Sequence, residues 1–446
     1  MPTAAPPRRF LIIDYNLSRV DDVRHMAAYA RTRHGARTTL VRPQPTETDA
    51  RICDEVIDLD PLDPDFAAAG EKLLGARRAE FAAGIVFSDN AVHSGAELLR
   101  RLGLPVDAPD PASAAFCKLT YRGAEARHAG LLAAQRIMVP DFAEVTSAHT
   151  LREFAAGHPD GFVVKPAKEG NNRGVVLVRP GDDPEAAFAE VRPYLSGGAL
   201  CEQLIPYERE FSHDGLGELT FLTEKMTAPG RYPVEVAQVL PARVSPAGRA
   251  TLLRAGRIAN WLVGQCDGPF HNEIKLSRDD RHAAVVEPNR RPAGMKIWSL
   301  ARWVYGVDLY ERWVDTAFGA PAPAALPEPA RSAATVMLGV ATDQDFAPGD
   351  VRPDADPFAD ALAATRARHG LADGELTAAE FGWVSAERRT LHAVARDNAD
   401  FAAQGCVVLH TDRTDVRDVV RTLRELWPAA LAAAVHTPEA ALLEAC

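Results

Sequence analysis

Residues 271–289 constrain the fold of this chain more than any other tract. Two runs typical of β-strands, His271–Leu276 and Ala283–Asn289, flank the polar segment Ser277–His282. Strand-like runs on both sides of a short polar centre are typical of an antiparallel hairpin. The sequence therefore predicts that these two runs pair with each other.

This hairpin brings acidic residues together. If its turn is centred near Asp280, positions equally distant from Asp280 face each other, and Glu273 lies opposite Glu287. Directly opposed side chains in antiparallel strands have Cβ atoms about 4.5–5.5 Å apart. Asn289 comes two residues after Glu287 and points to the same face. A register shift of one residue would break this arrangement.

Two neighbouring carboxylates favour a divalent cation. Each raises the pKa of the other unless a positive charge lies between them. Hard oxygen ligands suit Mg²⁺, which binds through one or two carboxylates together with substrate phosphates. Glu273, Glu287 and Asn289 are therefore candidate magnesium ligands. The alternative is a surface hairpin with scattered acidic residues.

The first 110 residues alternate strand-like and helical segments. Strand-like runs occur at 10–13, 38–41, 54–59 and 84–87, and helical spacing occurs at about 20–34, 65–82 and 94–102. This alternation predicts a small doubly wound α/β domain with a parallel sheet. Neither G-x-G-x-x-G nor G-x-x-x-x-G-K-[ST] occurs, which argues against a dinucleotide fingerprint and a P-loop.

A strand–loop–strand unit in the middle of the chain is suited to phosphate. The apolar run Gly161–Pro166 leads into a small polar loop, 167–174, and a second apolar strand, Val175–Val178, follows. Such a loop can fold over a polyphosphate and donate backbone N–H groups. Lys165, at the base of the loop, can reach phosphate as a point charge. An ordinary hairpin loop with an exposed lysine is the alternative.

Another apolar run, Ala199–Pro206, precedes Glu210. Extended backbone at Glu202–Leu204 can present N–H and C=O groups to an adenine edge, and the Glu210 carboxylate can accept hydrogen bonds from ribose hydroxyls. A plain sheet strand is the alternative for this run.

Together these motifs resemble the ATP-grasp superfamily over roughly residues 85–310, and most closely its carboxylate–amine ligases, such as L-amino acid ligases and dipeptide synthetases. The most specific part is Glu287–Gly294, which looks like the family's E-x-N-x-R-x-x-G signature, with Glu273 as the upstream acid. Less specific matches are Lys118, Val164–Pro166, Glu202 and Glu210.

The resemblance implies an α/β and α+β architecture in three parts. Residues 1–110 would form an α/β pre-ATP-grasp domain. Residues 111–318 would form the ATP-grasp region, with a helical start, a lid at about 140–205 and a metal-binding part at about 206–318. Residues 319–446 would form a linker and a C-terminal subdomain, and the Ala/Pro-rich stretch 319–331 is typical of a linker.

The resemblance also implies roles for single residues. Lys118 and Lys165 would contact ATP phosphates, Glu202 and Leu204 would belong to the adenine hinge, and Glu210 would hold ribose. Glu273, Glu287 and Asn289 would hold two Mg²⁺ ions, for which Mn²⁺ can substitute. Arg291 would stabilise the transferring phosphoryl group or the oxyanion, with Lys165 as a second catalytic group. Candidate substrate residues are Glu235, His271, Arg291 and Gly294.

The implied reaction is amide or peptide bond formation between amino-acid-like substrates through an acyl phosphate, with release of ADP and phosphate. Glu235 and His271 are candidate bases for the amine, and a satisfied core histidine is the alternative for His271. A biotin-dependent-type carboxylase and a non-catalytic nucleotide-binding module are the alternative functions. No biotinylation-type segment is present, and a module without turnover would be expected to lose a metal ligand.

Composition limits the partners. The formal net charge is −11 and no basic stripe offsets it, which argues against nucleic acid. No apolar run approaches the roughly 20 residues needed to cross a bilayer. A cytoplasmic protein that binds small molecules, with a homodimer as one possible assembly, is therefore expected.

Overall fold

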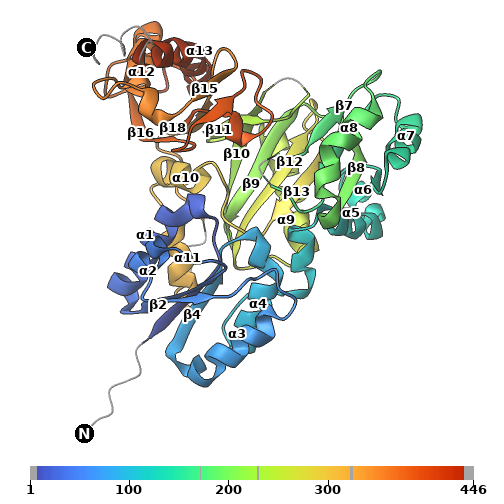
Figure 1. Ribbon diagram of the computed structural model, residues 1–446, viewed down its shortest axis with the longest axis vertical. Coiled ribbons are helices and arrows are strands. Elements are labelled where there is room, and N and C mark those ends of the chain that lie inside the picture. The colour runs from blue at the N-terminus through green and yellow to red at the C-terminus, as the bar shows by residue number, and fades with distance from the viewer. Residues whose placement is uncertain (1–7, 171, 229–230, 322–324, 436–446) are drawn as a thin grey trace.

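A parallel four-stranded sheet, in the order β3-β2-β1-β4, organises the N-terminal part of the computed structural model. The structure describes residues 8–170, 172–228, 231–321 and 325–435 (Figure 1). The strands are β1 (Arg9–Ile13), β2 (Arg37–Arg42), β3 (Glu55–Asp58) and β4 (Phe81–Val86). The helices around them are α1 (Val20–His34), α2 (Glu47–Ile52), α3 (Phe66–Leu74) and α4 (Val92–Arg101).

Helices cover both faces of this sheet because side chains alternate along each strand. Phe10 and Ile12 pack with Met26 of α1 on one face. Leu11 and Ile13 pack with the α3 and α4 side chains on the other. The predicted doubly wound α/β fold is confirmed, with strands close to the predicted runs. The segment predicted as helical at 65–82 instead ends in a 3₁₀ turn, Gly75–Glu80, and β4 begins at Phe81.

The largest sheet has eight strands in the order β13-β12-β9-β10-β11-β14-β18-β16. All of its pairs are antiparallel. Its strands are β9 (Arg209–Leu216), β10 (Leu219–Thr227), β11 (Glu235–Leu240), β12 (Pro269–Leu276), β13 (Ala283–Asn289), β14 (Ser332–Leu338), β16 (Leu376–Trp383) and β18 (Ala403–Leu409). Helix α9 (Pro246–Leu262) packs on one face of the sheet, against the strand residues Phe211, Leu222 and Ile274. Glu210 and Glu273, which alternate with these residues, therefore face the other side.

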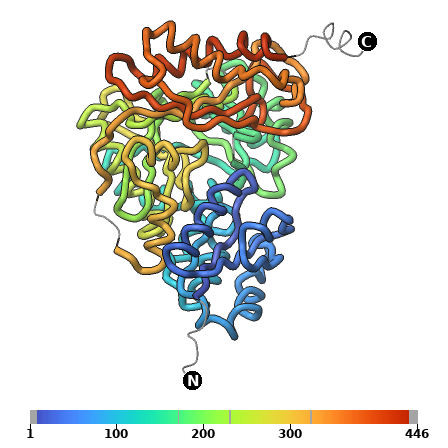
Figure 2. Tube along the Cα trace, turned by 90° about the vertical axis from the view of Figure 1, so that its left-hand side faces the viewer, coloured from blue at the N-terminus to red at the C-terminus, as the bar shows by residue number. Residues whose placement is uncertain are grey.

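The C-terminal part of the chain continues the same sheet, because β14 pairs with β11 and β18 pairs with β14. Helices α12 (Pro357–His369) and α13 (Val416–Ala434) pack against it, and β15 (Gln344–Phe346) pairs with β17 (Arg389–Leu391). Figures 1 and 2 show this part as the upper layer of the molecule. The boundaries 1–110, 111–318 and 319–446 stay a prediction, and the last of these ranges extends beyond the described residues.

A third, antiparallel sheet has the order β5-β8-β6-β7 and lies within the predicted lid range. Its strands are β5 (Phe142–Glu144), β6 (Phe162–Pro166), β7 (Val176–Val178) and β8 (Ala199–Gln203). The helices before and around it are α5 (Lys118–Arg127), α6 (Ala129–Ala134), α7 (Ala148–Gly157) and α8 (Pro184–Val191). Helices α10 (Ile297–Tyr305) and α11 (Leu309–Ala317) pack between the N-terminal sheet and the large sheet.

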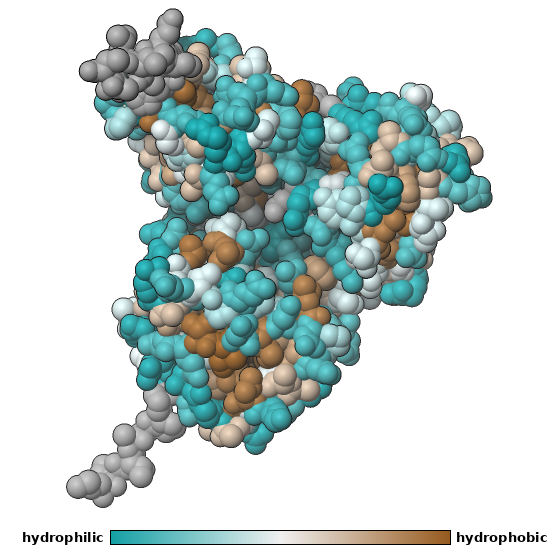
Figure 3. All heavy atoms as spheres, in the orientation of Figure 1, coloured by the Kyte–Doolittle hydropathy of each residue, from teal (hydrophilic) through white to brown (hydrophobic). Residues whose placement is uncertain are grey.

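Figure 3 shows one face of the molecule hollowed where these parts meet, with mostly hydrophilic residues around the recess. Within the described ranges, none of the helices combines the length and the apolar character that crossing a bilayer requires.

Gly215, near the end of β9 beside the β9–β10 turn, gives a stability prediction. A Cβ atom there would lie 2.0 Å from the Leu219 carbonyl oxygen and 2.6 Å from the Phe270 ring, so the β9–β10 hairpin would have to shift. We expect Gly215→Ala to lower the free energy of unfolding by roughly 3 kcal/mol, the upper end of the usual overpacking cost. Gly382→Ala is the matched control, because a Cβ on that edge-strand glycine meets nothing within 4 Å. Equal urea midpoints for the two variants would contradict the expectation.

Candidate active site

The hairpin of β12 and β13 places two carboxylates face to face. Glu273 lies directly opposite Glu287, and His271 lies opposite Asn289, as the sequence pattern predicts. The uniform register predicted from a turn centred on Asp280 is wrong nearer the turn, where Ile274 pairs with Val285. A β-bulge beside Glu273 shifts the register, with Val286 as the extra residue.

A buried lysine on β10 organises the acidic side chains of the sheet face. Lys225 Nζ lies 2.7 Å from Glu273 and 3.5 Å from Glu210, and it also contacts Glu235. The three carboxylates lie close enough together to hold a metal ion. Burial raises the pKa of Glu235 to about 7. Burial also opposes ionisation of Glu273, but Lys225 and His271 outweigh it and hold the pKa of Glu273 well below its usual value.

His271 lies between two acids. Its Nδ1 is 2.6 Å from Asp214 and its Nε2 is 3.3 Å from Glu273. Asp214 also accepts hydrogen bonds from Ser212, at 2.6 Å, and Thr223, at 2.7 Å. Burial lowers the pKa of His271, but Asp214 and Glu273 raise it more, to about 9. The ring is therefore charged near neutral pH and holds Glu273 in place instead of accepting a proton.

Lys118 joins the second carboxylate of the hairpin to the loop after β6. Its Nζ lies 2.8 Å from Glu287 and donates a hydrogen bond to the Glu169 carbonyl at 2.8 Å. Burial raises the pKa of Glu287, but Lys118 outweighs this effect and the net pKa is lowered. Asn171, in the middle of the predicted phosphate loop, lies outside the described residues.

Lys165 and Glu202 form a buried ion pair at 2.8 Å. Arg122 of α5 also binds Glu202, through Nε at 2.9 Å and Nη2 at 3.2 Å. Burial opposes ionisation of Glu202, but Arg122 and Lys165 hold its pKa at about 2. This carboxylate is thus neutralised by protein groups. The backbone of Glu202 and Gln203 is paired with the neighbouring strands β5 and β6, so Leu204, directly after β8, is the part of the predicted hinge that lies outside the strand pairing.

Arg291, the arginine of the signature, binds Asp89 of the N-terminal part at 2.5 Å, and its Nη2 lies 3.5 Å from Asn289 Oδ1. Beside it, a Cβ built on Gly294 would meet nothing within 4 Å, so there is open space at this position. The signature therefore lies where the large sheet meets the N-terminal part.

The donor set fits a divalent cation. Glu273 and Glu287 are ionised, they face each other, and the Asn289 amide shares their face. The Lys118 ammonium lies 2.8 Å from Glu287, and the Lys225 ammonium lies 2.7 Å from Glu273. The carboxylates therefore stabilise positive charge at these positions. Hard oxygen donors with neutralising cations beside them suit Mg²⁺ together with phosphate.

Sequence reasoning did not single out Lys225 or Arg122. Lys225 is one of only seven lysines in the chain. Its strand pairs with the strand of Glu210 and places the two residues opposite each other, and this pairing was the available signal. Arg122 is one arginine among many, and no local pattern marks it.

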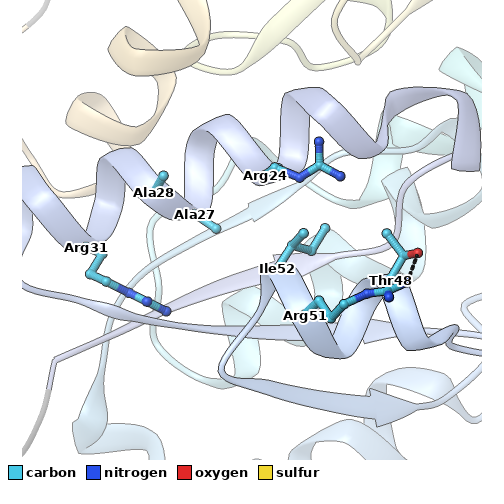
Figure 4. Close-up of a pocket in the computed structure, with 7 residues that line it drawn as sticks. All are labelled: Arg24, Ala27, Ala28, Arg31, Thr48, Arg51 and Ile52. Carbon is cyan, nitrogen blue, oxygen red and sulfur yellow. Dashed lines mark hydrogen bonds between the residues drawn. The ribbon is translucent and has the colours of Figure 1, made fainter.

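A separate groove lies between α1 and α2 on the N-terminal part. Its cavity of about 430 Å³ is lined by Arg24, Arg31 and Arg51 with Ile52 between them (Figure 4). Each guanidinium has a local partner: Asp21 for Arg24, Asp54 for Arg31 and Thr48 for Arg51. None of the predicted site residues lines this groove.

Comparison with known proteins supports the architecture. No family model matches the chain. A D-alanine–D-alanine ligase from Acidiphilium cryptum is 28% identical over 180 residues, which are 39% of this chain and 56% of that protein. The chain thus spans about half the length of this curated relative.

Solved structures match over nearly the whole chain. An L-amino acid ligase from Bacillus licheniformis superposes with a TM-score of 0.69 at 16% identity and covers 95% of this chain and 98% of its own. The ADP complex of purK, an N5-carboxyaminoimidazole ribonucleotide synthetase, gives 0.65 at 14% identity, covering 97% and 100%. A carboxyaminoimidazole ribonucleotide synthase from Aspergillus clavatus with ATP gives 0.64 at 12% identity, covering 96% and 99%.

The chain shares the fold of these proteins, as its resemblance to the ATP-grasp superfamily predicts. Among these structures, the L-amino acid ligase aligns with this chain almost from end to end.

Proposed function

We propose that this protein is an ATP- and Mg²⁺-dependent ligase that joins a carboxylate to an amine. The observation that carries the proposal is the facing pair of Glu273 and Glu287, with Lys118 and Lys225 beside them. Such a group of charges is suited to a triphosphate with its cations. ATP-bound and ADP-bound structures of the same fold support nucleotide binding.

In this proposal, Lys118 and Lys165 exchange their carboxylate partners for phosphate oxygens when the nucleotide binds. The hinge at the end of β8 presents its backbone to adenine at Leu204, beyond the paired residues Glu202 and Gln203, and Glu210 accepts hydrogen bonds from ribose. Glu273, Glu287 and Asn289 hold the Mg²⁺ ions. These assignments follow from the resemblance. Glu210, Glu273, Glu287 and Asn289 lie on strands of the large sheet, and Lys118 contacts this sheet through Glu287.

The reaction would proceed in two steps. ATP and Mg²⁺ supply an activated γ-phosphoryl group with its charge neutralised. The substrate carboxylate takes that group, giving an acyl phosphate and ADP, and the amine then displaces phosphate to form the amide. Arg291, whose planar guanidinium suits carboxylate and phosphate oxygens, orients the reacting carboxylate. The lid loop at 167–174 excludes water, because an acyl phosphate hydrolyses readily.

Of the two candidate bases for the amine, Glu235 fits better than His271. The pKa of Glu235, raised to about 7 by burial, suits a proton acceptor near neutral pH. His271 already carries a proton, because Asp214 and Glu273 raise its pKa to about 9. In its more specific form, the proposal is that the substrates are amino-acid-like and that the product is a dipeptide.

The homodimer stays a prediction.

Phosphate release tests the proposal. We expect the protein with ATP and Mg²⁺ to release phosphate only when both a carboxylate and an amine are present in a pool of amino acids. Mass detection of the product would identify the pair. Release that needs bicarbonate and biotin would indicate the carboxylase instead. Nucleotide binding with no release under any pairing would indicate a module without turnover.

A further inference from the structure

The side chain of Arg122 connects the two halves of the candidate site. It is 1% exposed, in α5. Its guanidinium donates to both Glu202 oxygens, to Glu125, and to two successive backbone carbonyls of β13. Those carbonyls are Val285, at 3.0 Å, and Val286, at 3.1 Å. All three guanidinium nitrogens are therefore bonded.

The two carbonyls belong to the β-bulge of the hairpin. In a regular strand, successive carbonyls point to opposite edges. At this bulge both lie within reach of one guanidinium. Strand β13 is also the edge of the large sheet, and a bridge to Ile137 covers only its first residue, Ala283. Within the described residues, no strand therefore pairs with the outer side of β13 at Val285 and Val286. Arg122 takes that place for Val285 and Val286.

The bulge decides where Glu287 points. On the turn side, Leu276 pairs with Ala283, Lys275 with Ala284 and Ile274 with Val285. Continued without a bulge, this register would pair Glu273 with Val286 and place Glu287 opposite Asn272. Because side chains alternate between faces, Glu287 would then lie on the face opposite to Glu273. The extra residue, Val286, restores the face-to-face pair.

The same guanidinium reaches the lid. Glu202 lies on β8, the strand of the predicted adenine hinge, and its carboxylate also binds Lys165 at 2.8 Å. One buried side chain thus spans from the lid strand to the bulge that aims Glu287. Neither contact is expected from the local sequence.

We propose that Arg122 is a positioning residue, which holds the β13 bulge in the conformation that turns Glu287 toward Glu273 and ties that conformation to the lid strand. It touches neither substrate nor metal in this role. The expected effect on metal binding rests on the proposed function. The clamp, by which we mean the Arg122 hydrogen bonds to the Val285 and Val286 carbonyls, does not depend on it.

The test compares Arg122→Lys with Glu125→Gln. Lysine keeps a buried cation near Glu202 but has one nitrogen, so it cannot hold the carboxylate and both carbonyls together. Glu125→Gln removes the negative charge of another Arg122 partner, keeps an oxygen that can accept the hydrogen bond, and leaves the bulge contacts in place. If Arg122→Lys gives no folded protein, the charge-balanced double variant Arg122→Gln/Glu125→Gln replaces it.

Two readouts decide. Hydrogen exchange of the segment 283–289 reports the bulge, and Mn²⁺ titration by electron paramagnetic resonance, with a non-hydrolysable ATP analogue present, reports the metal site. We expect Arg122→Lys to speed exchange in that segment and to weaken Mn²⁺ roughly tenfold or more, the usual effect of losing a group that orients a ligand. Glu125→Gln should change neither. Metal-free affinity for the analogue should change far less than Mn²⁺ affinity.

Unchanged exchange at 283–289 in folded Arg122→Lys would overturn the clamp. A smaller fraction of protein that binds Mn²⁺, with an unchanged Mn²⁺ dissociation constant, would also overturn it, because a merely structural role predicts that result. If wild-type protein binds no Mn²⁺ with the analogue, the proposed function fails, and hydrogen exchange alone still decides whether Arg122 holds the bulge.

Discussion

Glu287→Gln is expected to abolish ATP-dependent product formation and to leave the fold intact. The substitution keeps the shape of the side chain and removes its charge, which is the property a divalent cation needs. Loss of one preorganised electrostatic group in an active site costs roughly 10²–10³-fold in rate, and we expect at least that loss here. Lys118 would keep its hydrogen bond to the Glu169 carbonyl, so the loop after β6 stays anchored.

The measurement is ADP formation with saturating substrates, beside a thermal unfolding curve for the same preparation. Glu208→Gln is the matched control, because that side chain is 84% exposed and its ion pair is with Arg278, which is also exposed. The control should retain full activity. Turnover of Glu287→Gln at the wild-type rate would remove this carboxylate from the metal site.

Lys225→Met is expected to remove both activity and much of the stability. The Lys225 side chain is 0% exposed and lies among Glu210, Glu235 and Glu273. Methionine matches its length but leaves these acids without their common cation. Removing one partner of a buried charge cluster typically costs about 3–5 kcal/mol.

Lys275→Met provides the comparison for that variant. Lys275 lies on the same sheet face, 3.9 Å from Glu210, but its side chain is 30% exposed. A partly exposed pair is worth about 1 kcal/mol or less. Urea unfolding of both variants should therefore separate them by several kcal/mol. Equal stabilities would show that Lys225 is not the cation that holds the acidic side chains together.

The sequence allowed the central pair of the site to be predicted because that pair is local. Glu273 and Glu287 flank a short turn, and alternation along two strands was enough to place them opposite each other. The detailed register was not predictable from the hairpin. It depends on a bulge at Val286, and that bulge contacts Arg122, which lies far away in the sequence.

The surroundings of the pair were harder to predict for the same reason. Lys225 meets Glu235 and Glu273 only because β10 lies between β9 and β11 in the sheet, an order set by long-range pairing. The ion pair of Arg291 with Asp89 joins the signature to the N-terminal part. The C-terminal strands likewise extend the large sheet through the pairing of β14 with β11. Local patterns carry none of this information.

The central claim is that Glu273 and Glu287 together hold divalent cations against ATP. Anomalous diffraction from crystals grown with Mn²⁺ and a non-hydrolysable ATP analogue tests it most directly. We expect metal density between these two carboxylates, within bonding distance of the Asn289 amide oxygen, with the analogue's phosphates beside Lys118 and Lys165. Metal found only among Glu210, Glu235 and Glu273, or a nucleotide bound away from the hairpin, would contradict it.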